Sequence, residues 1–237
     1  MEFSSECRVK VLPGIIVLFA AAAMATPESA SAGCGFGDIN AANAQVSVVT
    51  PAKLHFVEDD SLVKGCPSDS VKCQKKGYVV AGDVVLTGAV QGAYICTGYV
   101  TARGSALNEW LPTAALEPAS PDQQHPSDWA GKWSMDDNDI TITSQGNAVV
   151  IHGEAEWKGD ISVHTGNLDG VVTPMKDVVA FTMGDDKTLP FAAGDEFDCR
   201  VTMVRRGPYL LVRDNDQCGG ANVTFTGFYR RGIKTKR

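Results

Sequence analysis

Cysteines are the residues of this chain with the most distinctive chemistry. Cys7 lies in the N-terminal segment, and six cysteines follow it: Cys34, Cys66, Cys73, Cys96, Cys199 and Cys218. An even set in an exported protein indicates disulfide bonds. Four of the six cysteines precede a polar stretch at 118–128 and two follow it, so Cys199 pairs with Cys218 if no bridge crosses that stretch. That bridge closes a loop of about twenty residues and should stabilise its half by about 3 kcal/mol.

The other four cysteines leave their pairing open. Proximity favours Cys66 with Cys73, which bound the loop CPSDSVKC, and this leaves Cys34 with Cys96. Zinc binding by Cys66 and Cys73 is the alternative, but zinc sites use closer pairs of cysteines in matched sets. We therefore expect disulfides and no metal.

Catalytic constellations are missing from the sequence. Four histidines are scattered without metal-ligand spacing: His55, His125, His152 and His164. The chain has no G-x-S-x-G, no H-E-x-x-H and no phosphate-binding loop. The acidic run 136–139 lacks the glycine and glutamate of an EF-hand, and adjacent acidic residues such as Asp185 and Asp186 point to opposite faces of a strand. We expect a non-catalytic protein without a cofactor.

The N-terminal segment 1–32 is typical of a signal peptide. Arg8 and Lys10 precede an apolar run over 11–25, and small residues follow. The pattern allows cleavage after Ala25 or after Ala32, and the alternative is lipid attachment at Cys34. No other segment has the ~20 apolar residues that a membrane span needs. We expect a periplasmic or secreted protein with no membrane span in the mature chain.

The net charge excludes one class of partner. A formal charge of -7 and an isoelectric point near 5.1 leave no basic surface that could neutralise phosphates. Nucleic acid is therefore not an expected partner. The mature chain is expected to be a monomer.

A polar stretch with three prolines, residues 118–128, divides the mature chain and is typical of an interdomain linker. The first predicted domain covers 33–117 and the second covers 129–232. A short basic tail, 233–237, follows. We predict an all-β fold with two small antiparallel β-barrel domains stabilised by disulfides.

The first domain consists of short apolar runs closed by Gly, Pro or Asp, which favours a small all-β barrel. The motifs GDVV (82–85), AYICTGYV (93–100) and EWLPTAAL (109–116) resemble bacterial Src-homology-three-like domains of the cell envelope. Glu109 stands where that family usually has Gly. The resemblance implies a short 3₁₀ turn after the last strand and an aromatic groove for cell-wall peptides or proteins, with Tyr94, Tyr99 and Trp110 as ligand-binding residues.

Two physical arguments oppose a single aromatic groove. Trp110 has the size of a core anchor for a small barrel. Tyr94 and Tyr99 point to opposite faces if one strand contains both, because side chains alternate along a strand.

The second domain alternates more regularly. Val149, Ile151 and Ala155 fall on one strand face and His152 and Glu154 on the other, as a half-buried strand requires. The same pattern places further residues inward, among them Trp157, Phe181, Phe197, Cys199, Val201, Met203, Val223, Phe225 and Tyr229. We predict six to eight antiparallel strands in a barrel or a strongly bent sheet.

Both ends of the second domain carry a resemblance. The start WAGKW (129–133) resembles lipocalin-like barrels and small exported protease inhibitors, and the end CGGANVTFTGFY (218–229) resembles an uncharacterised bacterial envelope family. The glycines of CGGAN are expected to allow positive φ beside the disulfide. The alternative is that this loop is a rigid binding tip.

These observations favour a non-catalytic binding protein of the bacterial envelope that engages peptidoglycan or an envelope protein. The first alternative is a secreted inhibitor of a lysozyme or protease, with the second barrel as the inhibitory unit. The second is a carrier of a small hydrophobic ligand, against which the large inward residues of the second barrel argue.

Overall fold

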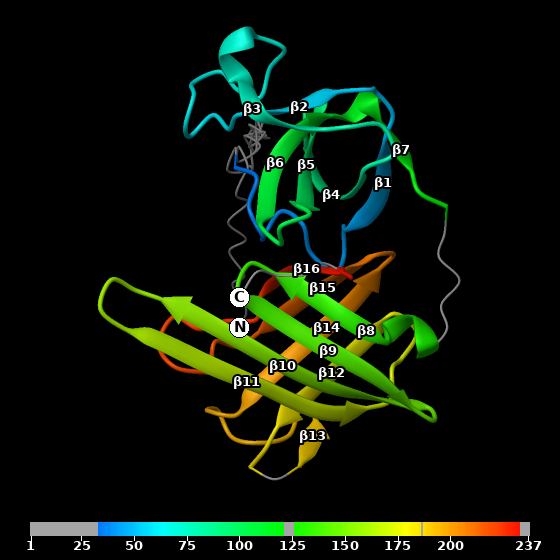
Figure 1. Cartoon of the computed structure of the whole chain (residues 1–237), viewed down its shortest axis with the longest axis vertical. Helices are drawn as coiled ribbons and strands as arrows, with labels where there is room; N and C mark the ends of the chain where they lie inside the picture. The colour runs from blue at the N-terminus through cyan, green and yellow to red at the C-terminus, as the bar shows by residue number, and fades with distance from the viewer. Residues whose placement is uncertain (1–32, 121–125, 186, 233–237) are drawn as a thin grey trace, which may run out of the picture. The chain divides into compact units, whose positions relative to one another are not determined.

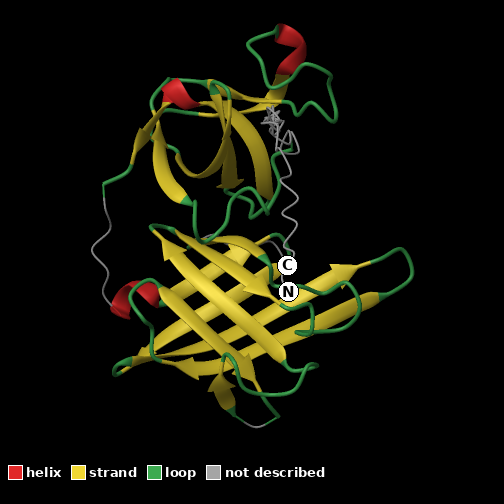
Figure 2. Ribbon diagram, turned by 180° about the vertical axis from the view of Figure 1, so that it is seen from behind, coloured by secondary structure: helices red, strands yellow, loops and turns green. Residues whose placement is uncertain are grey.

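The computed structural model describes residues 33–120, 126–185 and 187–232. The predicted signal peptide, the basic tail and His125 lie outside the described residues. The described chain has no α-helix; it forms two antiparallel β-sheets and three short 3₁₀ helices (Figure 1, Figure 2). The predicted all-β class is confirmed. No helix in this part of the chain is long and apolar enough to cross a membrane.

The first sheet has seven strands in the order β3-β2-β6-β5-β4-β1-β7. The strands are β1 (Gln45–Val49), β2 (Leu54–Val57), β3 (Gln74–Val79), β4 (Val84–Gln91), β5 (Tyr94–Val100), β6 (Ala106–Pro112) and β7 (Leu116–Pro118). The 3₁₀ helix η1 (Val71–Cys73) precedes β3, and η2 (Thr113–Ala115) follows β6. The helix η2 lies within the motif EWLPTAAL (109–116), where the resemblance leads one to expect a short 3₁₀ turn after the strand.

The second sheet has nine strands in the order β11-β10-β9-β8-β16-β15-β14-β12-β13. After η3 (Pro126–Trp129) come β8 (Gly131–Met135), β9 (Asn138–Gln145), β10 (Ala148–Lys158), β11 (Val163–Val172), β12 (Val178–Met183), β13 (Thr188–Pro190), β14 (Cys199–Arg206), β15 (Tyr209–Asp214) and β16 (Gly227–Arg231). The sheet exceeds the expected six to eight strands by one. The three-residue β13, which pairs with β12, accounts for this difference.

The second sheet curls until its two ends almost meet. β11 contacts β12 and β13, although no described ladder joins them. Side chains close the seam instead: the Val171 amide donates to Thr188 Oγ1 at 2.8 Å, and the Asp169 amide donates to Met183 Sδ at 3.3 Å. The sheet is therefore a nearly closed barrel.

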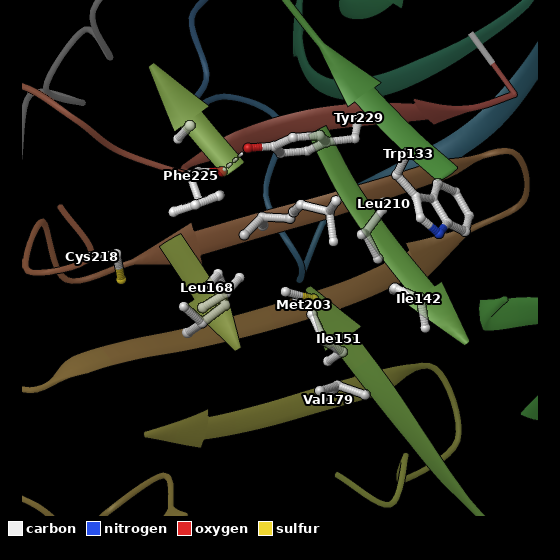
Figure 3. Packing of buried hydrophobic residues seen from close by; sticks show 14 of the residues in the cluster. Trp133, Ile142, Ile151, Leu168, Val179, Met203, Leu210, Cys218, Phe225 and Tyr229 are labelled. Atoms are coloured by element: carbon white, nitrogen blue, oxygen red, sulfur yellow. Dashed lines mark hydrogen bonds between the residues drawn. The ribbon is translucent and has the colours of Figure 1, made fainter. Parts of the chain in front are cut away.

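Apolar side chains fill the interior of this barrel, as the alternation predicts. Figure 3 shows residues of several strands packed against one another, among them Trp133, Ile142, Ile151, Leu168, Val179, Met203, Leu210, Phe225 and Tyr229. All of these residues are almost completely buried. The interior of the barrel is therefore densely packed with apolar side chains.

The inward orientation expected for Phe197 is wrong, because 75% of this side chain is exposed. β14 begins only at Cys199. Phe197 instead belongs to a turn in which the Asp198 amide donates to the Asp195 carbonyl and the Asp195 amide donates to Asp198 Oδ2. The period-two pattern does not extend into a turn, so it misplaces this residue.

Three disulfides join Cys34 with Cys96, Cys66 with Cys73, and Cys199 with Cys218. The structure thereby resolves the open pairing of the first four cysteines in favour of the arrangement that proximity suggests. Disulfides persist in oxidising compartments, which indicates a non-cytoplasmic location.

All described residues belong to one compact unit. One buried cluster combines residues of the two sheets, among them Leu86, Val100, Trp110, Val204, Tyr209 and Phe228. The Tyr209 hydroxyl also donates to the Val84 carbonyl at 2.7 Å. The sheets therefore share part of one hydrophobic core.

Candidate functional site

Trp110, a predicted ligand-binding residue, is a core residue with one polar contact. Only 2% of its surface is exposed, and it packs in the cluster that includes the Cys34–Cys96 disulfide. Its Nε1 donates to Asp59 Oδ2 at 3.2 Å. The structure thus agrees with the core-anchor interpretation of Trp110.

The two tyrosines lie on different faces of β5. Tyr94 is half-buried against the cluster that contains Trp110, whereas Tyr99 packs against the separate cluster that contains Val85 and Leu111. The Tyr99 hydroxyl donates to Asp83 Oδ1 at 3.4 Å. The three predicted aromatic residues therefore do not form one groove.

A polar pocket opens where the β2–β6 ladder ends. Val57 and Trp110 are the single register pair of these two strands. Beyond this pair the strands separate, and a cavity of about 390 Å³ lies in the gap. Its walls come from the N-terminal arm (residues 33–38), the segment after β2, and strands β3 and β6. They consist of Gly33, Cys34, Gly35, Asp38, Glu58, Asp59, Ser61, Leu62, Lys75, Asn108, Glu109 and Trp110.

A lysine between two glutamates forms the charged part of this pocket. Lys75 Nζ lies 2.8 Å from Glu109 Oε1 and 3.5 Å from Glu58 Oε2. Burial opposes the charge on Lys75, but the contacts with Glu109 and Glu58 outweigh it and raise the pKa of the ammonium. Burial raises the pKa of the Glu109 carboxyl, and the contact with Lys75 only partly offsets this effect.

Two buried polar atoms of the pocket lack a hydrogen-bond partner among the described residues. One is the acceptor Glu58 Oε2, whose contact with Lys75 at 3.5 Å is an ion pair without a hydrogen bond. The other is the donor Asn108 Nδ2. Buried polar atoms in native proteins are nearly always paired with protein or ordered water, so this acceptor and this donor are groups of the pocket that still have hydrogen-bonding capacity.

Asp59 has a different role, because protein donors already occupy its oxygens. The Cys34 amide donates to Oδ2 at 2.9 Å and the Ser61 amide donates to Oδ1 at 2.8 Å, in addition to the Trp110 contact. Burial raises the pKa of this carboxyl, but these hydrogen bonds outweigh it and lower the pKa. Asp59 therefore holds the N-terminal arm and Trp110 in place around the pocket.

Sequence reasoning missed this site except for one signal. Glu109 departs from the glycine that the resemblance leads one to expect, and it is the pocket's partly buried carboxylate. Glu58, Lys75 and Asn108 come from three separate strands or strand ends, and no spacing in the sequence connects them.

A second hollow, about 800 Å³, lies between the first sheet and the β14–β15 turn. Its charged groups are already engaged: Arg206 pairs with Asp177 and donates to the Ala44 carbonyl, and Arg205 lies 3.6 Å from Asp128. The contact of Arg206 with Ala44 joins the two halves of the described chain, and the engaged charges make this hollow less suited to a polar ligand than the polar pocket.

The histidines remain apart in the structure. The described part of the chain has no group of three or more His, Cys, Asp or Glu residues that could hold a metal. His152 Nδ1 lies 2.6 Å from Asp169 Oδ1 on an exposed strand face, and His55 Nδ1 contacts the Lys75 carbonyl at 2.8 Å. Each therefore has a local structural partner.

The CGGAN loop, residues 218–222, covers β11. Positive φ occurs at Asp216 and Asn222, and at neither Gly219 nor Gly220, so the expected reason for the two glycines is wrong. They are needed because the loop lies against Gly166, and the Gly220 amide donates to the Thr165 carbonyl at 3.1 Å. The loop is a support for β11.

No protein-family model, curated protein or solved structure matches this chain.

Proposed function

We propose that this chain is a non-catalytic binding protein of an oxidising compartment, and that the polar pocket holds a short peptide segment of the cell wall or of an envelope protein. The observation that carries this proposal is the pair of buried atoms without a hydrogen bond, Glu58 Oε2 and Asn108 Nδ2. A peptide unit offers one N–H donor and one C=O acceptor. It can therefore satisfy both atoms together.

The charge of the pocket favours a ligand with an amino group. Four carboxylates line it, those of Asp38, Glu58, Asp59 and Glu109, against one ammonium, Lys75. Partly buried carboxylates attract a positive charge strongly because the local dielectric constant is lower than in water. A wall peptide or protein segment that carries a free amino group meets this requirement.

The pocket is also rigid before the ligand binds. The Cys34–Cys96 disulfide and the two contacts of Asp59 with the Cys34 amide and Trp110 fix the arm that forms one wall. A preformed site avoids part of the entropic cost of ordering groups on binding. Its volume of about 390 Å³ lies within the range of small-ligand sites.

The test uses the chain from residue 33 onward, with its disulfides formed, and Asn108→Leu as the decisive variant. Binding to purified soluble peptidoglycan fragments and to a solubilised envelope extract is measured. The variant should lose about tenfold in affinity, since a hydrogen bond is worth about 1 kcal/mol or more. Its free energy of unfolding should stay unchanged or rise, because an unpaired buried donor is removed.

Asn167→Leu, on an exposed position of β11, is the matched control and should bind like the parent chain. Glu58→Gln removes the negative charge but keeps an oxygen that can accept a hydrogen bond. It should weaken binding of a ligand that carries an amino group. Retention on neither the wall fragments nor the envelope extract, or equal binding by Asn108→Leu, would sink the proposal.

A further inference from the structure

The polar pocket carries more negative charge than its own lysine can balance. Four carboxylates line it, and Lys75 is the single cation among the described residues of its walls. Lys75 lies between Glu58 and Glu109. The other two carboxylates, Asp38 and Asp59, accept hydrogen bonds from backbone amides and an indole N–H, which carry no net charge. A second cation would be stabilised here, because charges attract more strongly in a partly buried site than in water.

The N-terminal arm brings a backbone nitrogen to these carboxylates. Gly33 lines the pocket, and the amide of the next residue, Cys34, donates to Asp59 Oδ2 at 2.9 Å. Successive backbone nitrogens are less than about 4 Å apart, so the Gly33 nitrogen lies within about 7 Å of this carboxylate oxygen. The Cys34–Cys96 disulfide holds the arm in this position.

Processing of the N-terminal segment decides what this nitrogen is. The sequence predicts signal-peptide cleavage after Ala25 or after Ala32, with lipid attachment at Cys34 as the alternative. The sulfur of Cys34 is bonded to Cys96 and is therefore not free for a lipid. Cleavage after Ala25 leaves the Gly33 nitrogen as a neutral peptide amide. Cleavage after Ala32, at the end of the motif ASA (30–32), turns it into an α-ammonium group.

We propose that cleavage follows Ala32 and that the new α-ammonium of Gly33 binds among the carboxylates of the polar pocket, where it competes with the amino group of a ligand. That ligand is the one of the proposed function, on which the competition rests. The position of cleavage then regulates the pocket. A chain that begins at Gly33 supplies the second cation itself, whereas a chain that begins at Thr26 leaves the carboxylates to the ligand.

Two chains with their disulfides formed test the contact, one beginning at Gly33 and the other at Thr26. An NMR titration measures the pKa of the α-amino group in each. In the Gly33 chain this pKa should lie above the ordinary range of about 7.7–8.0, since the carboxylates of the pocket outnumber Lys75. In the Thr26 chain it should lie within that range, because the amino group is seven residues away from Gly33.

Two substitutions in the Gly33 chain locate the cause of a raised pKa. Glu58→Gln removes a carboxylate of the pocket and should lower the pKa of the α-amino group toward the ordinary range. Glu196→Gln removes the same charge from an exposed residue between β13 and β14 and should leave this pKa unchanged. An ordinary pKa in the Gly33 chain, or equal effects of the two substitutions, overturns the proposal.

Binding of soluble peptidoglycan fragments near pH 7 tests the competition. The Thr26 chain should bind them at least about threefold more tightly than the Gly33 chain, because an occupied site lowers the apparent affinity. Equal affinities of the two chains overturn the competition. Binding by neither chain counts against the proposed function, and the pKa of the α-amino group then decides whether the contact exists.

Mass spectrometry of the full chain after export from a bacterial host identifies the position of cleavage. The expected first residue is Gly33, and Thr26 as the first residue overturns the proposal.

Discussion

Gly166 of β11 and Gly219 of the CGGAN loop lie backbone against backbone. A Cβ added to Gly219 would lie 2.8 Å from the Gly166 Cα, and one added to Gly166 would lie 3.0 Å from the Gly219 Cα. Real Cβ atoms rarely come that close to another chain segment. The loop can therefore support the β10–β11 hairpin only while both positions lack a side chain.

Gly166→Ala should destabilise the protein by about 1–3 kcal/mol, the usual cost of forcing a group into a packed site. Urea unfolding of the parent chain and of each variant measures the change in the free energy of unfolding. Gly37→Ala is the control, since a Cβ there meets nothing within 4 Å, and it should change stability by less than about 0.5 kcal/mol. Equal stabilities of the two variants would contradict the close approach.

Replacing Cys199 and Cys218 together by Ala should cost about 3 kcal/mol, because the unfolded chain regains the entropy of a loop of about twenty residues. Amide exchange locates a second effect. The Gly220 amide, which bonds to Thr165, should exchange faster than amides of the first sheet once the loop is released. Unchanged protection at Gly220 would mean that the loop holds the hairpin without its disulfide.

The His152–Asp169 pair predicts a pH effect with a defined sign. The hydrogen bond with Asp169 raises the pKa of His152 above its ordinary value of about 6.5. The stability from this pair is then fully present below about pH 6.5 and is lost as the pH rises through the folded pKa. An NMR titration should place the pKa of His152 above its ordinary value, and Asp169→Asn should remove the elevation. Both side chains are more than half exposed, so the change in unfolding free energy is small.

Trp110→Phe should raise the pKa of Asp59, because it removes one of the hydrogen bonds that lower it. The stability contributed by Asp59 is present above its unfolded pKa of about 3.9 and is lost as the pH falls through the folded value. Acid unfolding of the variant should therefore begin at a higher pH than that of the parent. Trp157→Phe, in the second sheet, should leave the onset unchanged, and an unchanged onset for Trp110→Phe would deny the role of this contact.

The features of the fold that depend on residues adjacent in the sequence could be predicted from the sequence. The period-two pattern over 149–155 identifies the buried face of β10, because a strand sends successive side chains to opposite faces. The same rule separates Tyr94 from Tyr99. It fails at Phe197, where the strand has not yet begun, since alternation holds only within a strand.

The sequence by itself determined an all-β chain with an even set of cysteines after residue 32, and proximity favoured the disulfide arrangement found. Only the tertiary structure brought Glu58, Lys75 and Asn108 together, and only it placed Gly219 against Gly166. The physical reason is that such contacts depend on strand order and on where a ladder opens. Both are set by the packing of the whole core, which no local pattern encodes.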